Sequence, residues 1–140
     1  MEKRALPAVL ASLAELRRYA REAAADAGID DERSYQLQLA VDEIATNIIA
    51  YGYKDASPTS EILIGSEVAD GALIITLEDT GPAFDPRTRN MPTAEELAKP
   101  LEERAIGGLG IYLATQGVDR FDYRREGDRN LNIFEVRRVR

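Results

Sequence analysis

The apolar residues of this 140-residue chain change their spacing after the first third of the sequence. Up to about residue 53 they recur every three or four positions, which is the period of an amphipathic helix. From residue 61 onward, two segments have the alternating pattern of β-strands and are separated by a turn sequence. The chain therefore combines a helical N-terminal part with a later part that forms strands.

Two helices are predicted in the N-terminal part. The first spans residues 7–27, and Gly28 follows it as a C-terminal cap. The second spans residues 30–53 and opens with acidic side chains, which suit a helix N-terminus. Their apolar stripes consist of Leu10, Leu13, Leu16 and Ala20 in the first helix, and of Leu37, Val41, Ile44, Ile48 and Tyr51 in the second.

Two hairpins are predicted after the helices. Residues 61–68 and 72–79 flank Asp70-Gly71, a strong turn signal, and residues 118–125 and 131–139 flank a turn around Gly127. A proline-rich loop over residues 80–107, with a short helical piece near 93–98, connects them through a helix at 109–117. This order predicts a single domain over residues 1–140. Its fold is a two-layer α+β sandwich, with a mixed, mainly antiparallel sheet and helices on one face.

Composition excludes several classes of function. Hydrophobic residues make up 44% and charged residues 31% of the chain, which is typical of a globular domain. A net charge of −7 argues against nonspecific binding to nucleic acid or to an anionic membrane. We find neither an apolar run of about 18 residues nor a signal peptide, and we expect a cytoplasmic protein. With no cysteine and no histidine, acid–base chemistry falls to carboxylates, Lys or Tyr.

Glu43 and Asn47 are four residues apart in the second predicted helix, so their side chains lie on the same side of it. They belong to a stripe that runs beside the apolar face and that includes the small residues Ala40 and Ala50. Small alanines around two polar groups leave room for a ligand. Taken alone, the pair is more typical of an ordinary solvated helix surface.

Asp79 ends the strand predicted at residues 72–79. The two-residue period places its carboxylate on the same face as Leu73, Ile75 and Leu77, where a charge needs a partner or a ligand donor. Gly81 then turns the chain away. Taken alone, the Asp and Gly residues also suit an ordinary turn.

A glycine-rich segment at residues 107–110 leads into the predicted helix at 109–117. Its backbone amides could approach phosphate groups, since a helix N-terminus favours anions. It is not the dinucleotide-binding fingerprint, because no βαβ unit surrounds it. A simple turn explains this segment equally well when it is considered alone.

The order of these segments resembles the GHKL ATPase superfamily, which includes gyrase, MutL and the histidine kinases. Within that superfamily, the chain is more similar to the RsbW-like anti-sigma factor serine kinases. Residues 40–53 resemble the N-box of that family, residues 79–86 its first glycine box, and residues 107–113 its second glycine box. The resemblance covers residues 5–138.

This resemblance implies a Bergerat ATP-binding fold with ATP and Mg²⁺ as cofactors. It implies that Asn47 binds Mg²⁺, that Asp79 accepts a hydrogen bond from the adenine amino group, and that Glu43 is the general base. It further implies nucleotide contacts from Gly81, Phe84, Gly107, Gly108, Leu109 and Gly110.

The resemblance also implies partners. These are a STAS-type anti-anti-sigma protein, phosphorylated on serine, and a sigma factor that is held inactive, with the chain itself acting as a homodimer. Two departures from the family bear on the kinase activity. Ala50 stands where a basic residue is common, and residues 129–132 replace the Gly-Thr pair found in other GHKL proteins.

Three alternatives remain open. The first is a regulatory module of the same fold that binds nucleotide without transferring phosphate. The second is a scaffold or phosphoryl acceptor that binds no nucleotide, which would require all four motifs to coincide by accident. The third, a histidine kinase catalytic domain, is disfavoured because no phosphoacceptor histidine precedes the domain.

Overall fold

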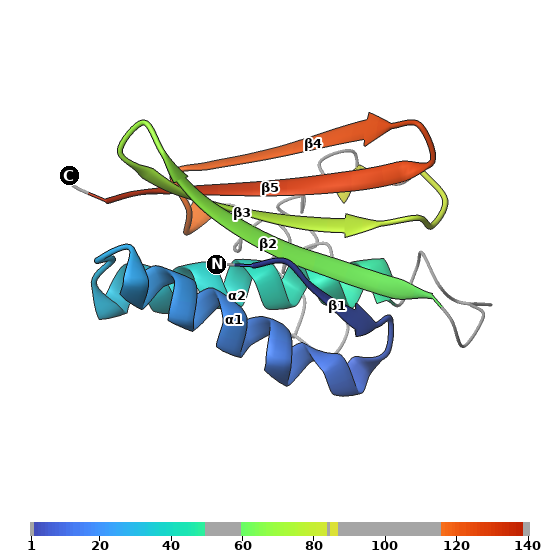
Figure 1. Cartoon of the computed structure of the whole chain (residues 1–140), viewed down its shortest axis with the longest axis horizontal. Coiled ribbons are helices and arrows are strands. Elements are labelled where there is room, and N and C mark those ends of the chain that lie inside the picture. Colours follow the sequence, from blue (N-terminus) through green and yellow to red (C-terminus); the bar gives the residue numbers. More distant parts are fainter. Residues whose placement is uncertain (1, 50–59, 84, 87–115, 139–140) are drawn as a thin grey trace, which may run out of the picture.

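A computed structural model describes residues 2–49, 60–83, 85–86 and 116–138. In chain order the elements are β1 (Arg4–Pro7), a 3₁₀ turn (Leu10–Ser12), α1 (Leu13–Asp26), α2 (Asp31–Asn47), β2 (Glu61–Ala69), β3 (Ala72–Asp79), β4 (Arg120–Glu126) and β5 (Arg129–Arg137). The strands form one sheet in the order β1-β2-β3-β5-β4, and both helices pack on one face of it (Figure 1). The predicted two-layer α+β sandwich is confirmed, and each neighbouring strand pair is antiparallel.

The two helices are separated by a short, well-defined connection. Gly28 has a φ of +75°, and the amide of Ile29 donates to the carbonyl of Ala24 at 2.9 Å, as in a Schellman cap. Asp30 then caps α2, because its side chain accepts a hydrogen bond from the Arg33 amide at 2.9 Å. The predicted boundary between the two helices is therefore correct.

The start of the first helix was predicted wrongly. The chain from Arg4 to Pro7 is an edge strand paired with β2, and α1 begins only at Leu13. A proline is tolerated at the end of an edge strand, where its missing amide breaks no ladder bond. The hydroxyl of Ser12 donates to the Pro7 carbonyl at 2.7 Å and fixes the turn into α1.

Both predicted hairpins are present. Asp70 and Gly71 have φ values of 52° and 77°, as required at the centre of a tight two-residue turn between β2 and β3. The second hairpin is displaced from its predicted position, since β4 begins at Arg120 and β5 spans Arg129–Arg137. The predicted helical piece at 93–98, and nearly all of the predicted loop and helix over residues 87–115, lie outside the described residues.

Alternation along the strands separates a core face from an open face. Leu73, Ile75 and Leu77 of β3 lie opposite Val136, Phe134 and Asn132 of β5. Except for Asn132, these side chains form the core together with residues of α1 and α2. The open face carries charged groups, including the Glu78 carboxylate, which pairs with Lys3 at 2.9 Å and with Arg129 at 2.8 Å.

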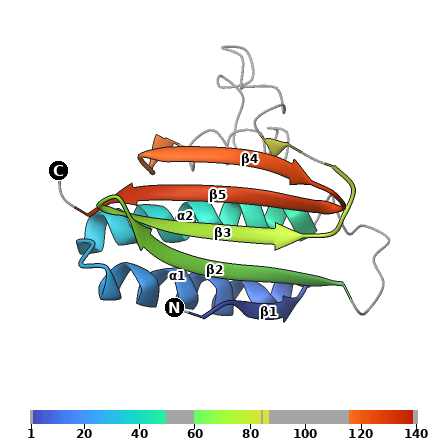
Figure 2. The same ribbon diagram turned by 45° about the horizontal axis from the view of Figure 1, so that its top comes forward.

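The two helices lie side by side beneath the sheet, and α2 runs in the same direction as β3 (Figure 2). The Arg33 guanidinium near the start of α2 donates to the carbonyl of Arg137, which is paired with Ala72 at the start of β3. The C-terminal ends of α2 and β3 therefore both lie at the opposite end of the molecule. In the described part of the chain, no helix has the length and apolar character needed to cross a membrane.

Candidate functional site

Asn47 is the last residue of α2, and its side chain is only 2% exposed. Its Nδ2 donates to the backbone carbonyl of Glu43 at 2.8 Å, which fixes the orientation of the amide group. The Oδ1 atom is buried and has no hydrogen-bond partner among the described residues. Burying an acceptor in this state costs about 1–3 kcal/mol, so this oxygen is suited to a ligand such as a hard metal ion.

Glu43 lies one helical turn before Asn47 and is half-buried. Burial raises the pKa of its carboxyl group, and the negative charge of the adjacent Asp42 raises it further. Asp42 itself forms an ion pair with Arg17 of α1. A carboxylate with a raised pKa is a stronger base than an exposed glutamate, which is the property expected of a proton acceptor.

Asp79 ends β3 on the helix-facing side of the sheet, as the alternation predicted, and is 3% exposed. Its Oδ2 accepts hydrogen bonds from the Gly81 amide at 2.9 Å and from Asn130 Nδ2 at 3.1 Å. Its Oδ1 is buried and accepts no hydrogen bond from the part of the chain that the structure describes. One carboxylate oxygen is therefore held in place by the protein, while the other is available to a hydrogen-bond donor on a ligand.

Asn130 is a site residue that the sequence analysis did not identify. It lies opposite Asp79 in the β3–β5 ladder, where its Nδ2 also donates to the carbonyls of Gly81 at 3.2 Å and Pro82 at 3.1 Å. Its Oδ1 accepts from the Tyr123 hydroxyl and from Arg125 Nη1. The available signal was its spacing, since Asn130 is in phase with the buried Phe134 and Val136 of the same strand.

The site residues form two groups at one end of the molecule. Hydrogen bonds join Asp79, Gly81 and Asn130, and α2 carries Glu43 and Asn47. Each group presents one buried oxygen without a partner. An acceptor for an amino group and a neutral oxygen for a metal ion fit the two ends of ATP·Mg²⁺, so the described residues suit this cofactor.

The remaining residues expected at the site cannot be placed. Phe84, Gly107, Gly108, Leu109 and Gly110 lie outside the described residues, as does Ala50. Their roles in nucleotide binding remain predictions. The described part of the site consists of the end of β3 with Asn130 of β5, and of the end of α2.

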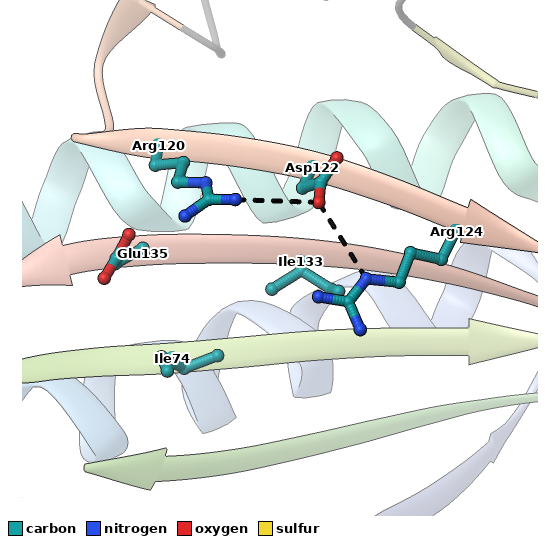
Figure 3. A pocket seen from close by; sticks show the side chains of 6 residues that line it. All are labelled: Ile74, Arg120, Asp122, Arg124, Ile133 and Glu135. Atoms are coloured by element: carbon teal, nitrogen blue, oxygen red, sulfur yellow. Dashed lines mark ion pairs between the residues drawn. The ribbon is translucent and has the colours of Figure 1, made fainter. Parts of the chain in front are cut away.

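A pocket of about 130 Å³ lies on the open face of the sheet, away from the helices (Figure 3). Its lining comes from β3, β4 and β5, and its polar rim has Asp122 Oδ2 3.9 Å from Arg120 Nη2 and 3.9 Å from Arg124 Nε. Pockets that enclose drug-sized ligands have volumes of roughly 300–1,000 Å³. This pocket is too small for a nucleotide and lies on the opposite face from Asp79 and Asn130.

Comparison with known proteins identifies relatives of this chain. The model of the family described as the histidine kinase-like ATPase domain matches residues 6–134. The chain is 31% identical over 97 residues to the serine-protein kinase RsbW of Listeria innocua, covering 69% of this chain and 61% of the relative. It is 31% identical over 84 residues to RsbW of Bacillus cereus, covering 59% of this chain and 51% of the relative. The chain thus spans half to three fifths of the length of these relatives.

Solved structures share the fold at low sequence identity. The RsbU and RsbW domains of Rv1364c from Mycobacterium tuberculosis match with a TM-score of 0.64 and 16% identity, over 98% of this chain and 32% of that one. The catalytic domain of the histidine kinase ThkA matches with a TM-score of 0.55 and 16% identity, over 99% of this chain and 98% of that one. The resemblance to RsbW-like proteins and to the GHKL fold is confirmed.

Proposed function

Because the chain belongs to the histidine kinase-like ATPase family, we propose that it binds ATP with Mg²⁺ and phosphorylates a serine of a partner protein. The observation that carries this proposal is the pair of buried oxygens without partners, Asn47 Oδ1 and Asp79 Oδ1, at the same end of the molecule. Neither oxygen is satisfied by the described residues, and ATP·Mg²⁺ offers a donor for one and a cation for the other.

In this proposal Asp79 accepts a hydrogen bond from the adenine amino group, and Gly81 follows it closely enough for the backbone to meet the base. Asn47 provides one oxygen ligand to Mg²⁺, which neutralises phosphate charge when bound. Phe84 and residues 107–110 complete the nucleotide contacts. Protein groups therefore fix both ends of the nucleotide before phosphoryl transfer.

Glu43 is the proposed general base. The serine oxygen of the partner attacks the γ-phosphorus, the bond from that phosphorus to the β–γ bridging oxygen breaks, and ADP leaves. The proton of the serine hydroxyl moves to the Glu43 carboxylate. The raised pKa of Glu43 suits this step because a more basic carboxylate holds the proton better.

The proposed acceptor is a STAS-type anti-anti-sigma protein. The proposed second partner is a sigma factor that the chain holds inactive until the phosphorylation state of the STAS protein changes. We further propose that the protein acts as a cytoplasmic homodimer. These assignments are supported by the similarity to RsbW serine-protein kinases, of which the chain spans only part.

The alternative function is a regulatory module that binds nucleotide without transferring phosphate. It is favoured by Ala50, which stands where related kinases often carry a basic residue. Both functions require ATP binding by the same residues. They differ only in whether Glu43 has a chemical role.

Replacement of Glu43 by glutamine separates these two functions. Phosphotransfer from ATP to a STAS-type protein is measured together with ATP affinity. We expect Glu43→Gln to retain ATP affinity within a few-fold and to lower the phosphotransfer rate by roughly 10²–10⁴-fold, the usual size of a general-base contribution.

The matched control is Glu32→Gln, the same chemical change at an exposed position in the first turn of α2. It should leave both quantities within a few-fold of the original protein. If Glu43→Gln turns over at the original rate, Glu43 is not the base. If the unmodified protein binds Mg·ATP but phosphorylates no STAS protein, its function is that of the regulatory module and not of a kinase.

A further inference from the structure

Asn132 of β5 has the least satisfied side chain in the described part of the chain. It is 0% exposed, and none of the described residues forms a hydrogen bond with its Nδ2 or its Oδ1. A buried amide group left in this state costs free energy at each polar atom, so buried amides are almost always paired. An apolar residue, in phase with Phe134 and Val136, would fill this position without that cost.

The position of Asn132 links it to the base-binding end of the site. It lies opposite Leu77 of β3 and Tyr123 of β4, and therefore on the same face of the sheet as Asp79 and Asn130. Asp79 lies opposite Asn130, so Asn132 is its diagonal neighbour in the ladder. Diagonal neighbours are typically about 7–8 Å apart, a separation that one purine ring system can bridge.

The polar atoms of Asp79 and Asn132 complement each other. Asp79 Oδ1 can only accept a hydrogen bond, whereas the amide of Asn132 can donate one as well. Adenine presents an amino donor beside acceptor nitrogens of its rings, and asparagine pairs with this combination through both of its polar atoms. Asn130 cannot take this role, because the protein already engages both of its polar atoms.

We propose that Asn132 is a base-contacting residue, which donates from Nδ2 to an acceptor nitrogen of the purine ring while Asp79 accepts from the amino group. This inference rests on the proposed ATP binding and adds a second residue to base recognition. It also explains a polar side chain at a core position. The free protein is destabilised by a buried amide whose Nδ2 gains a hydrogen-bond partner when nucleotide binds.

The test is Asn132→Leu, which keeps a similar shape and removes both polar atoms. The melting temperature of the free protein and its affinity for Mg·ATP are measured together. We expect the melting temperature to rise by about 2–6 °C, because an unsatisfied buried group is removed. We expect ATP affinity to fall about tenfold or more. Asn132→Val, with a side chain that strands favour, gives the same test if the leucine variant folds poorly.

The matched control is Gln38→Leu in α2, which removes an amide that already has a partner, the Ser34 hydroxyl at 3.1 Å. This control should not gain stability and should leave ATP affinity unchanged. Binding of 1-deaza-, 3-deaza- and 7-deaza-ATP then identifies the ring nitrogen. One analogue should bind the original protein more weakly than ATP does, yet bind Asn132→Leu as well as ATP does.

Four results would overturn the inference. Lower or unchanged stability of both Asn132→Leu and Asn132→Val would mean that the amide has a structural partner. A stabilised variant with unchanged ATP affinity would exclude a contact with the base. The same conclusion would follow if each deaza analogue lost as much affinity relative to ATP in the variant as in the original protein. If the unmodified protein binds no ATP, the proposed function fails first, and this inference fails with it.

Discussion

Replacing Asn130 by alanine removes the side chain that connects the end of β3 with β4 and β5. Its Nδ2 donates to Asp79 Oδ2 at 3.1 Å and to the carbonyls of Gly81 and Pro82. Its Oδ1 accepts from Tyr123 and Arg125. These bonds are not equivalent, because Asp79 is a buried carboxylate, whereas each of the other partners is neutral or exposed to water.

The size of the destabilisation expected for Asn130→Ala follows from these differences. The Gly81 carbonyl keeps a hydrogen bond from Arg125 Nη1 at 2.9 Å, and Pro82 is exposed to water. Tyr123 is half-buried and Arg125 is exposed, so both can bond to water. Asp79 is buried and keeps only the Gly81 amide. The loss is therefore dominated by a bond to a buried carboxylate, and with the small cavity we expect about 2–4 kcal/mol of destabilisation.

The free energy of unfolding is measured by urea denaturation for the original protein, Asn130→Ala and Tyr123→Phe. Tyr123→Phe removes one bond on the acceptor side of Asn130 and leaves Arg125 in place, so it should cost about 1 kcal/mol or less. Unchanged m-values would show that the unfolded states are comparable. A loss below about 0.5 kcal/mol for Asn130→Ala, or one equal to that of Tyr123→Phe, would refute this reasoning.

Three further predictions concern other parts of the chain. Asp79→Asn should weaken ATP binding and reduce the preference for ATP over GTP in competition experiments. Equal binding of ATP and GTP by the original protein would show that Asp79 does not recognise adenine. The phosphotransfer rate should fall on acidification at a pH above the ordinary titration range of glutamate, because only the ionised Glu43 accepts a proton. Burial raises the pKa of Glu43, and the charge of Asp42 raises it further. Asp42→Asn should move this fall in rate only part of the way to lower pH, since burial is the larger cause of the raised pKa. An unchanged pH dependence would exclude an effect of the Asp42 charge. Gly28→Ala should cost about 1 kcal/mol by backbone strain alone, since its φ is +75° and no atom within 4 Å would meet the added methyl group, whereas a stabilised variant would contradict the strain.

The features predicted correctly from the sequence are those set by local pattern. The apolar spacing of α2 and the Asp70-Gly71 turn act within a few residues, so they could be read directly from the chain. The orientation of Asp79 toward the helices also follows from simple alternation along β3. These features lead to the α+β sandwich and to the two motifs that the structure describes.

The features missed depend on long-range pairing. β1 is only four residues long and is held as a strand by β2, which lies more than fifty residues later in the chain. The role of Asn130 requires the register between β3 and β5, in which it lies opposite Asp79. Because the second hairpin was predicted to resume at residue 131, Asn130 was assigned to the turn rather than to the ladder. Register between distant strands cannot be obtained from the pattern of either strand alone.

The most direct test of the proposed site is calorimetric titration of ATP with and without Mg²⁺, for the original protein and for Asn47→Ala. The original protein should bind one ATP per chain, with an affinity at least about tenfold higher when Mg²⁺ is present. Asn47→Ala should retain the native circular dichroism spectrum and bind ATP with nearly the same affinity in both conditions, because the buried Oδ1 oxygen is gone. No ATP binding by the original protein, or an unchanged Mg²⁺ dependence in a folded Asn47→Ala variant, would contradict the assignment of this site.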